Sequence, residues 1–404
     1  MTKEEISLLL AKQRSFFETG ATIPVSFRQD QLDRLCAAVK KYEPDIHAAL
    51  REDLGKSGYE SFMCETGLVL SEISYMRRHV RRFSRGKTVA TPLAQFASHS
   101  YRQPVPRGNV LIMSPWNYPF LLTLDPLADA IAAGNTAIVK PSAYSPATSR
   151  VMETLISECF EPEYVAVVTG GREENSALLD GKFDLVFFTG SQAVGREVLR
   201  RCAEHLTPAV LELGGKSPCI VDKDADIDLA AAVIENAKTS RPSVCNAIET
   251  ILVHQEIAER ALPVIAEKLE PHHVELRACE RAQKILPQAV PARNEDWETE
   301  YLDLILAVRV VDDIEEALSH IARYGSGHSE AIITRDYAAA EDFLNRVDAA
   351  AVYVNASTRF TDGGEFGLGA EIGISTQKLH ARGPMGLQQL TTTKFLVRGS
   401  GQIR

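Results

Sequence analysis

The feature that most constrains this fold is an alternation of short apolar strands with longer helices, beginning at Asn109. The predicted strands are 109–114, 136–140, 165–169 and 184–188, and the helices between and after them are 121–133, 146–159 and 193–205. Strands that are apolar throughout are typical of parallel sheets whose two faces are both covered by helices. The first half therefore predicts a doubly wound α/β domain.

A second alternation predicts a second α/β domain. Strand and helix pairs are predicted over 248–269 and 304–321, and a last strand over 350–355. We expect a doubly wound cofactor domain over residues 1–221 and a smaller α/β catalytic domain over 222–387, with the active site in the cleft between them. The Asp-rich segment after Val221 is predicted to be the hinge.

Two segments are predicted to leave the main body. Residues 86–106 are polar and rich in proline towards their end, and residues 388–404 contain a β-prone run that predicts a returning strand. Together they predict a β-ribbon oligomerisation arm. An unpaired ribbon has exposed edges, so a partner subunit is expected, in a homodimer or a homotetramer.

Composition excludes several classes of protein. The net charge of −10 argues against nucleic acid or acidic lipid as the main partner. No apolar run reaches the roughly 18 residues of a membrane span, and the polar start lacks the core of a signal peptide. Seven cysteines without a CxxC pair, and histidines without ligand spacing, predict a metal-free cytoplasmic protein.

One cysteine lies in a setting that suits a nucleophile. Cys245 belongs to the segment RPSVCN, between a helix predicted to end near Lys238 and a strand predicted to begin at Ile248. A thiol in a loop beside Arg241 is accessible and has its thiolate favoured. A buried, inert thiol is the alternative, and position alone does not decide between them.

A tight turn, TGS at 189–191, joins the strand ending at Phe188 to the following helix. Backbone N–H groups at such a helix start suit a pyrophosphate, although a single glycine turn also marks ordinary strand–helix junctions.

Three motifs in the first half resemble aldehyde dehydrogenases, of a class 3-like kind. They are SPWNYP at 114–119, FFTGS at 187–191 and LELGGKSP at 211–218, and the resemblance runs to about Ala231. It implies a Cys245 nucleophile, an Asn117 amide in the oxyanion hole and a Glu212 base that activates water. Without it, Asn117 suits an ordinary loop and Glu212 an ordinary strand.

The same resemblance implies that NAD or NADP is the cofactor. The implied cofactor contacts are Trp116, Lys140, Ser142, Gly190, Ser191, Gly195 and, by a partial match, Glu300. Most of the family has a glutamate after Lys-Pro-Ser that binds a ribose hydroxyl, whereas this chain has Ala143. Loss of that acid removes a repulsion against a 2′-phosphate, so we expect NADP to be accepted alongside NAD.

Residues 232–404 resemble a related family, glutamate-5-semialdehyde dehydrogenase, also called gamma-glutamyl phosphate reductase. The strings that carry it are NAKTSRP at 236–242, YGSGHSEA at 324–331 and the whole of 353–387. This resemblance also places the nucleophile at Cys245. It implies a small anionic aldehyde or acyl phosphate as substrate.

Basic residues among glycines suit such an anion, because backbone and cations approach a carboxylate or phosphate together. The predicted substrate-binding residues are Arg241, Arg359, Lys378, His380 and Arg382. For any one of these residues taken singly, the alternative to substrate binding is a place in a solvent-exposed loop.

The two families differ in what resolves the thioester. A dehydrogenase uses water and a base and yields an acid, whereas an acyl-phosphate reductase exchanges phosphate and needs no hydrolytic base. We expect the acyl-phosphate chemistry, with a broad aldehyde dehydrogenase using Glu212 as the alternative. The change of resemblance also suggests a chimera, and a folded but catalytically silent chimera is a third reading.

Overall fold

The computed structural model describes residues 1–93, 98–362, 365–366, 378, 385, 387–388 and 390–396. The chain forms two compact units, which are considered separately. The first contains Met1–Leu211, Leu368–Gly373 and Met385–Arg404, and the second contains Glu212–Gly367 and Ile374–Pro384. The division thus falls after Leu211 and not after Val221, which ends a strand of the second unit.

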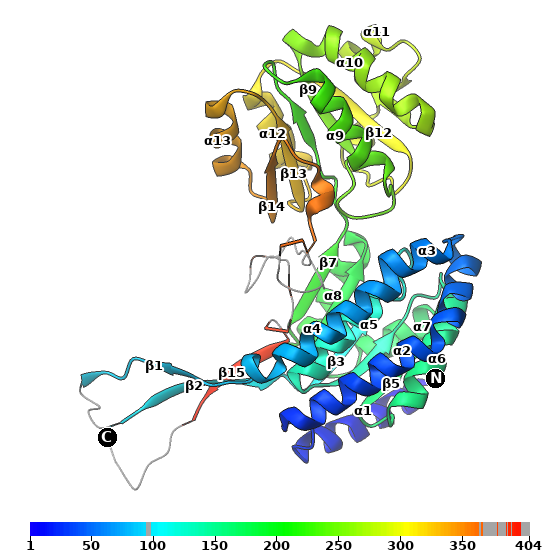
Figure 1. The fold of residues 1–404 in the computed structure, drawn as a ribbon, viewed down its shortest axis with the longest axis vertical. Helices are drawn as coiled ribbons and strands as arrows, with labels where there is room; N and C mark the ends of the chain where they lie inside the picture. The colour runs from blue at the N-terminus through cyan, green and yellow to red at the C-terminus, as the bar shows by residue number, and fades with distance from the viewer. Residues whose placement is uncertain are drawn as a thin grey trace. The chain divides into compact units, whose positions relative to one another are not determined.

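A five-stranded sheet forms the centre of the first unit, in the order β5-β4-β3-β6-β7. Figure 1 labels three of these strands, β3, β5 and β7. Its strands are β3 (Asn109–Met113), β4 (Thr136–Lys140), β5 (Val165–Val167), β6 (Leu185–Gly190) and β7 (Ala209–Leu213). The pairs from β5 through β6 are parallel. The chain reverses its direction of travel across the sheet between β3 and β6, which is where doubly wound sheets bind ligands.

Helices cover both faces of this sheet. They are α1 (Lys3–Glu18), α2 (Val25–Leu54), α3 (Gly58–Ser61), the π-helical η1 (Phe62–Thr66), α4 (Gly67–Phe83), α5 (Leu121–Ala133), α6 (Pro146–Cys159), α7 (Arg172–Leu179) and α8 (Gln192–His205). Helix α2 packs on α4, α5 and α6, whereas α1 packs on α7 and α7 on α8. Helix α5 is enclosed between its neighbours, which explains why it is apolar almost throughout.

The predicted arm is an antiparallel ribbon of three strands in the order β1-β2-β15. They are β1 (Lys87–Val89), β2 (Ser100–Pro106) and β15 (Thr391–Phe395). The return of the chain at 391–395 therefore pairs with the first excursion, as the β-prone sequence predicted.

The second unit contains a seven-stranded parallel sheet in the order β11-β10-β12-β9-β8-β13-β14. Its strands are β8 (Cys219–Val221), β9 (Thr250–His254), β10 (Glu275–Ala278), β11 (Val290–Pro291), β12 (Ile305–Val311), β13 (Ser329–Ile333) and β14 (Ala351–Val354). Its helices are α9 (Ile227–Thr239), α10 (Gln255–Leu269), η3 (Glu270–His272), α11 (Glu280–Ile285), η4 (Asn294–Trp297), α12 (Ile314–Tyr324), α13 (Tyr337–Arg346) and η5 (Thr358–Phe360).

Alternate residues of each central strand of this sheet enter different cores. Ile251 and Val253 pack with residues of α9 and α10, whereas Leu252 between them packs with residues of α12 and α13. Both faces are therefore covered, which is why runs such as 251–253 and 331–333 are apolar without alternation.

The segment predicted as a hinge is ordered structure of the second unit. Asp226 caps helix α9 by accepting a hydrogen bond from Leu229 N. Within the described residues, no helix is long and apolar enough to cross a membrane.

Candidate active site

The functional residues of the second unit converge because three of its strands start at the same edge of the sheet. Strands β8, β9 and β13 are parallel neighbours in the order β9-β8-β13. Cys245 and His328 lie in the segments that lead into β9 and β13, whereas Glu212 lies on β7, seven residues before the start of β8. Residues more than a hundred positions apart in sequence thus meet at the amino edge of one sheet.

Cys245 lies in the loop between α9 and β9, as predicted, and its side chain is half-buried. Its carbonyl oxygen accepts a hydrogen bond from Ser217 Oγ at 3.2 Å. The same oxygen lies so close to Gly215 that a Cβ on that residue would stand 1.9 Å from it. Backbone contact with the GGKS segment therefore fixes the position of the cysteine.

The reactive atoms of three side chains gather here. A Glu212 carboxylate oxygen, the Cys245 sulfur and a His328 ring nitrogen all lie within 4.8 Å of one another. His328 Nε2 is 3.5 Å from Glu212 Oε1, and both side chains are buried, at 1% and 5% exposure. The structure thus brings together the predicted nucleophile, the predicted base and a histidine to which the sequence assigned no role.

A relay of hydroxyl groups holds the ring of His328. Its Nδ1 is 2.6 Å from Ser329 Oγ, which donates to Thr361 Oγ1 at 2.7 Å. Tyr353 OH lies 2.7 Å from the same Thr361 oxygen. Because Ser329 uses its proton towards Thr361, it accepts from His328, so Nδ1 carries the imidazole proton.

One predicted anion-binding residue, Arg359, is tied to the cysteine loop. Its Nε donates to Ser240 Oγ at 3.2 Å, and its Nη1 donates to Asn246 Oδ1. Asn246 Nδ2 in turn donates to Thr361 O at 2.9 Å. The guanidinium is therefore anchored one residue from Cys245.

The other predicted substrate residues differ in setting. Lys378 forms an exposed ion pair with Asp348, and Arg241 is half-buried at the end of α9. His380 and Arg382 lie outside the described residues. Of the described members of this set, Arg359 donates a hydrogen bond to Asn246, the residue that follows the nucleophile.

Glu300 lies against the GG segment beside Glu212. Its Oε1 accepts a hydrogen bond from Gly215 N at 3.1 Å, and a Cβ on Gly214 would fall 1.7 Å from its Oε2. Burial raises the pKa of Glu300 to about 7, with repulsion from Glu249 and Glu212 adding to the effect and the Gly215 bond opposing it. At neutral pH this carboxyl is therefore close to half protonated.

The stability of the wild-type protein is expected to fall between about pH 5 and pH 7 because Glu300 ionises. Replacing Glu300 by glutamine should abolish this fall. Because the folded pKa is raised, folding takes up a proton in this window, and wild-type stability falls as the pH rises through it. Glu300→Gln keeps the Gly215 bond without the charge, so its free energy of unfolding should exceed that of wild type by about 3 kcal/mol well above pH 7 and match it below pH 5. Melting temperatures from pH 5 to pH 8 test this, with the exposed Glu298→Gln as control. A difference independent of pH would contradict it.

Several charged side chains near the start of β9 are buried. Lys238 Nζ is 3.0 Å from Glu249 Oε1, with exposures of 0% and 1%. Glu249 Oε2 also accepts from Tyr301 N at 2.7 Å. Lys216 Nζ donates to Thr299 O at 2.6 Å, and burial lowers its pKa to about 8.

In the first unit, a buried ion pair shapes the loop that carries Asn117. Lys56 pairs with Glu65 and donates to Asn117 O at 2.9 Å, while Glu65 accepts from the N–H groups of Phe120 and Leu121. The Asn117 side-chain oxygen accepts from Tyr118 N at 3.1 Å.

The predicted cofactor residues of the first unit lie at the carboxyl edge of its sheet. Strand β6 runs through Gly190, and Ser191 caps α8 by accepting from Val194 N at 3.4 Å. Gly195 is buried in the first turn of α8, and Trp116 is 39% exposed. This is the switch-point side of the sheet, where the start of a helix suits a dinucleotide phosphate.

Lys140 and Ser142 follow at the end of β4. Lys140 is buried, donates to Pro141 O at 2.8 Å, and has its pKa lowered to about 8 by burial. Ser142 Oγ accepts from Tyr144 N at 3.2 Å. A buried amine beside the switch point fits the ribose of a dinucleotide. Of the predicted cofactor residues, only Glu300 belongs to the second unit.

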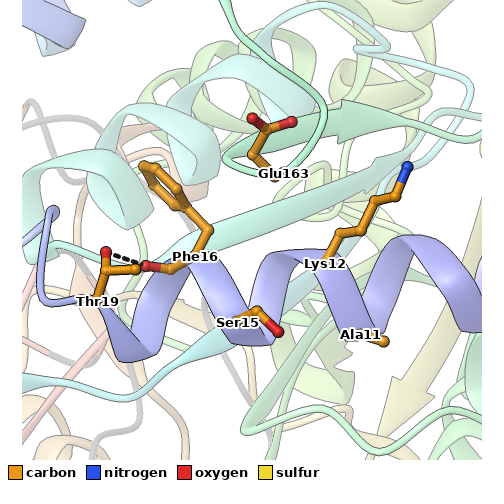
Figure 2. A pocket seen from close by; sticks show the side chains of 6 residues that line it. All are labelled: Ala11, Lys12, Ser15, Phe16, Thr19 and Glu163. Atoms are coloured by element: carbon orange, nitrogen blue, oxygen red, sulfur yellow. Dashed lines mark hydrogen bonds between the residues drawn. The ribbon is translucent and has the colours of Figure 1, made fainter.

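The hollow drawn in Figure 2 is lined by none of these residues. It is lined by five residues of the first helical segment and by Glu163, namely Ala11, Lys12, Ser15, Phe16, Thr19 and Glu163. The hydrogen bond drawn there, from Thr19 Oγ1 to Phe16 O, ends helix α1. This hollow therefore does not mark the candidate active site.

Two doubly wound sheets, a loop cysteine and the SPWNYP and LELGGKSP segments define a class of protein. A model of the aldehyde dehydrogenase family matches residues 1–296, and the chain belongs to this family. It is therefore an NAD(P)-dependent oxidoreductase.

Among its relatives, the gamma-glutamyl phosphate reductase of Carboxydothermus hydrogenoformans is 49% identical over 292 residues, covering 70% of this chain and 69% of the relative. The crystal structure of the gamma-glutamyl phosphate reductase of Thermotoga maritima has a TM-score of 0.79 at 34% identity, covering 99% and 100% of the two chains. The substrate-bound AldH of Staphylococcus aureus has a TM-score of 0.84 at 29% identity, covering 99% and 95%.

Proposed function

We propose that this chain is a gamma-glutamyl phosphate reductase, converting L-glutamyl 5-phosphate to glutamate 5-semialdehyde with release of phosphate. The observation that carries the proposal is a half-buried loop cysteine beside an anchored arginine, in a chain 49% identical to a relative of that name. An acyl phosphate of glutamate carries both a carboxylate and a phosphate, which suits the guanidinium of Arg359.

In this proposal Cys245 provides covalent catalysis. Its sulfur attacks the acyl carbon, the new C–S bond replaces the C–O bond to phosphate, and a thioester remains on the chain. NADPH, when bound, would supply the hydride for the reduction of this thioester. The C–S bond then breaks, and the aldehyde leaves. Asn117 is proposed to donate to the acyl oxygen, an interaction worth roughly 3 kcal/mol in such sites.

NADPH is proposed to be held by the switch-point residues of the first unit together with Glu300. Lys140 and Ser142 suit the adenosine ribose, the start of α8 suits the pyrophosphate, and Trp116 supplies an aromatic surface. These residues fit the cofactor through donors and a helix terminus rather than through a GxGxxG loop.

A second candidate function is the hydrolysis of the thioester by an aldehyde dehydrogenase. The observation that favours it is the Glu212 carboxylate within 4.8 Å of the Cys245 sulfur. A carboxylate there suits activation of water, the role that the family motif implies.

Formation of NADPH from glutamate semialdehyde, with and without phosphate, separates the two candidates. Phosphate-dependent turnover is expected, with a gain of at least about tenfold on adding phosphate. Turnover that ignores phosphate and disappears in Glu212→Gln would establish the hydrolytic alternative instead. Binding of NADPH without turnover in either condition would support a silent chimera.

Cofactor preference is expected to depend on position 143. Ala143 is exposed just after the Lys-Pro-Ser segment. A glutamate there would place a negative charge against a 2′-phosphate, so Ala143→Glu should raise the KM for NADPH about tenfold, a cost of about 1.4 kcal/mol. The KM for NADH should change less than twofold, and Ala143→Gln serves as the uncharged control. Equal changes for both cofactors would count against this assignment.

We further propose that the ribbon β1-β2-β15 joins two copies of the chain, giving a homodimer or a dimer of dimers. Within the described residues, β1 and β15 are edge strands, and Phe395 on β15 is 70% exposed. Exposed edges of this kind are usually covered.

A further inference from the structure

The imidazole of His328 is the candidate for a role that neither family motif assigns. It is 1% exposed, it precedes β13, and one of its nitrogens is within 4.8 Å of the Cys245 sulfur. A rotation of the cysteine side chain or one bridging water would close that separation.

The hydrogen bonds of the ring determine which nitrogen faces the cysteine. Nδ1 donates its proton to Ser329 Oγ, so a neutral His328 presents an unprotonated Nε2 to Glu212 Oε1 at 3.5 Å. A lone pair facing an ionised carboxylate is unfavourable, whereas an N–H facing it is favourable. The geometry therefore places Glu212 Oε1 where it can accept a hydrogen bond from Nε2 once that nitrogen carries a proton.

We propose that His328 accepts the thiol proton of Cys245, and that Glu212 stabilises the imidazolium that results. Cys245 then attacks as a thiolate, and the imidazolium returns the proton to the phosphate as the C–O bond breaks. The balance closes: the proton lost by sulfur leaves on phosphate, and the thiolate released with the aldehyde takes up one proton from solvent. In this scheme Glu212 is a positioning residue, which accounts for an acid in a reductase that needs no hydrolytic base.

Other ionisable groups also face this site and contribute to its titration. Glu330 on β13 accepts from Gly327 N at 3.1 Å, Tyr353 on β14 ends the hydroxyl relay, and Glu300 acts on Glu212 through space. Arg359 adds a positive charge beyond Asn246. The experiment therefore compares variants at fixed pH as well as complete pH profiles.

The test is the rate at which iodoacetamide alkylates Cys245 in the full chain, measured from pH 5 to pH 10 by peptide mass spectrometry. An ordinary thiol titrates near pH 8.5. Wild type is expected to titrate at least about one pH unit lower. His328→Asn keeps a donor for Ser329 but has no base, so its profile should return to about pH 8.5. Its rate at pH 6.5 should fall about fivefold, a modest factor because a more acidic thiolate is also a weaker nucleophile.

Matched thiols in the same chain serve as internal controls. Burial raises the pKa of Cys159 and Cys202 to about 11 and of Cys219 to about 12, so their peptides should stay unmodified below pH 8. Glu212→Gln should shift the Cys245 profile in the same direction as His328→Asn, and Ser329→Ala should shift it less.

A wild-type profile with its midpoint near pH 8.5 would overturn the proposal without any variant, and so would identical profiles for wild type and His328→Asn. If His328→Asn does not fold, Ser329→Ala and the wild-type profile decide. The proposal rests on the proposed reductase for its substrate, but alkylation needs neither substrate nor NADPH. A chain that fails the phosphate test yet shows a depressed Cys245 titration would retain the Cys245–His328 pair and lose only the assigned substrate.

Discussion

Cys245→Ala is expected to lower turnover of glutamate semialdehyde at least about 1,000-fold while leaving NADPH binding unchanged. Without the sulfur no thioester forms, and phosphate has no acyl group to exchange with. The variant removes a half-buried atom in a loop, so it should unfold within a few degrees of wild type.

Cys279→Ala is the matched control for this experiment. Cys279 is also a half-buried cysteine of the second unit, and its sulfur accepts a hydrogen bond from Val310 N at 3.4 Å. Its replacement should change turnover less than about threefold, because Cys279 contacts β12 and lies outside the cluster around Cys245. Retention of more than a tenth of the activity in Cys245→Ala would refute covalent catalysis at this residue.

Glu249→Leu is expected to be the most destabilising single change in the second unit, at about 3–5 kcal/mol. Glu249 is the buried partner of Lys238, and its charge also acts on the buried Lys216. Its removal leaves both amines without that acid. Loss of one member of a buried ion pair costs more than the pair contributes, since the remaining charge stays out of water.

Lys238→Met should cost less, about 1–3 kcal/mol, because Glu249 keeps the hydrogen bond from Tyr301 N and the field of Lys216. The loss of unfolding free energy in the double variant should be smaller than the sum of the two single losses, and closer to the loss in Lys238→Met. Urea unfolding followed by fluorescence and by hydrogen exchange in α9 gives these values. Strict additivity would show that the two side chains do not interact.

The elements could be predicted from sequence because they follow from runs of apolar residues. Strands β3, β4 and β9 and helices α5 and α6 begin and end within about two residues of the predicted bounds. The boundary between the units was harder to predict, since the Asp-rich segment after Val221 resembles a linker but is used to cap α9.

The candidate site was only partly predictable, since its geometry depends on strand order. Cys245 and Glu212 were proposed from motifs, but a histidine in a glycine-rich string gives no sign of its neighbours. His328 could have been found only by knowing that β13 lies beside β8. The buried Lys238–Glu249 pair was missed for a different reason, because charged residues are placed in water by default. The idea of a chimera stays a prediction; its join would fall within helix α9, whose residues on either side of the join pack into one core.

The contact between Gly215 and the Cys245 carbonyl has a consequence for how this chain tolerates change. Because this contact is made by main-chain atoms, it constrains the length of the 240–249 loop more strictly than it constrains the identity of the side chains there. Substitutions at exposed loop positions should therefore be accepted readily, whereas a one-residue insertion would displace the sulfur by up to about 3.5 Å. Natural variation around the nucleophile is thus expected to consist of exchanged residues at constant spacing.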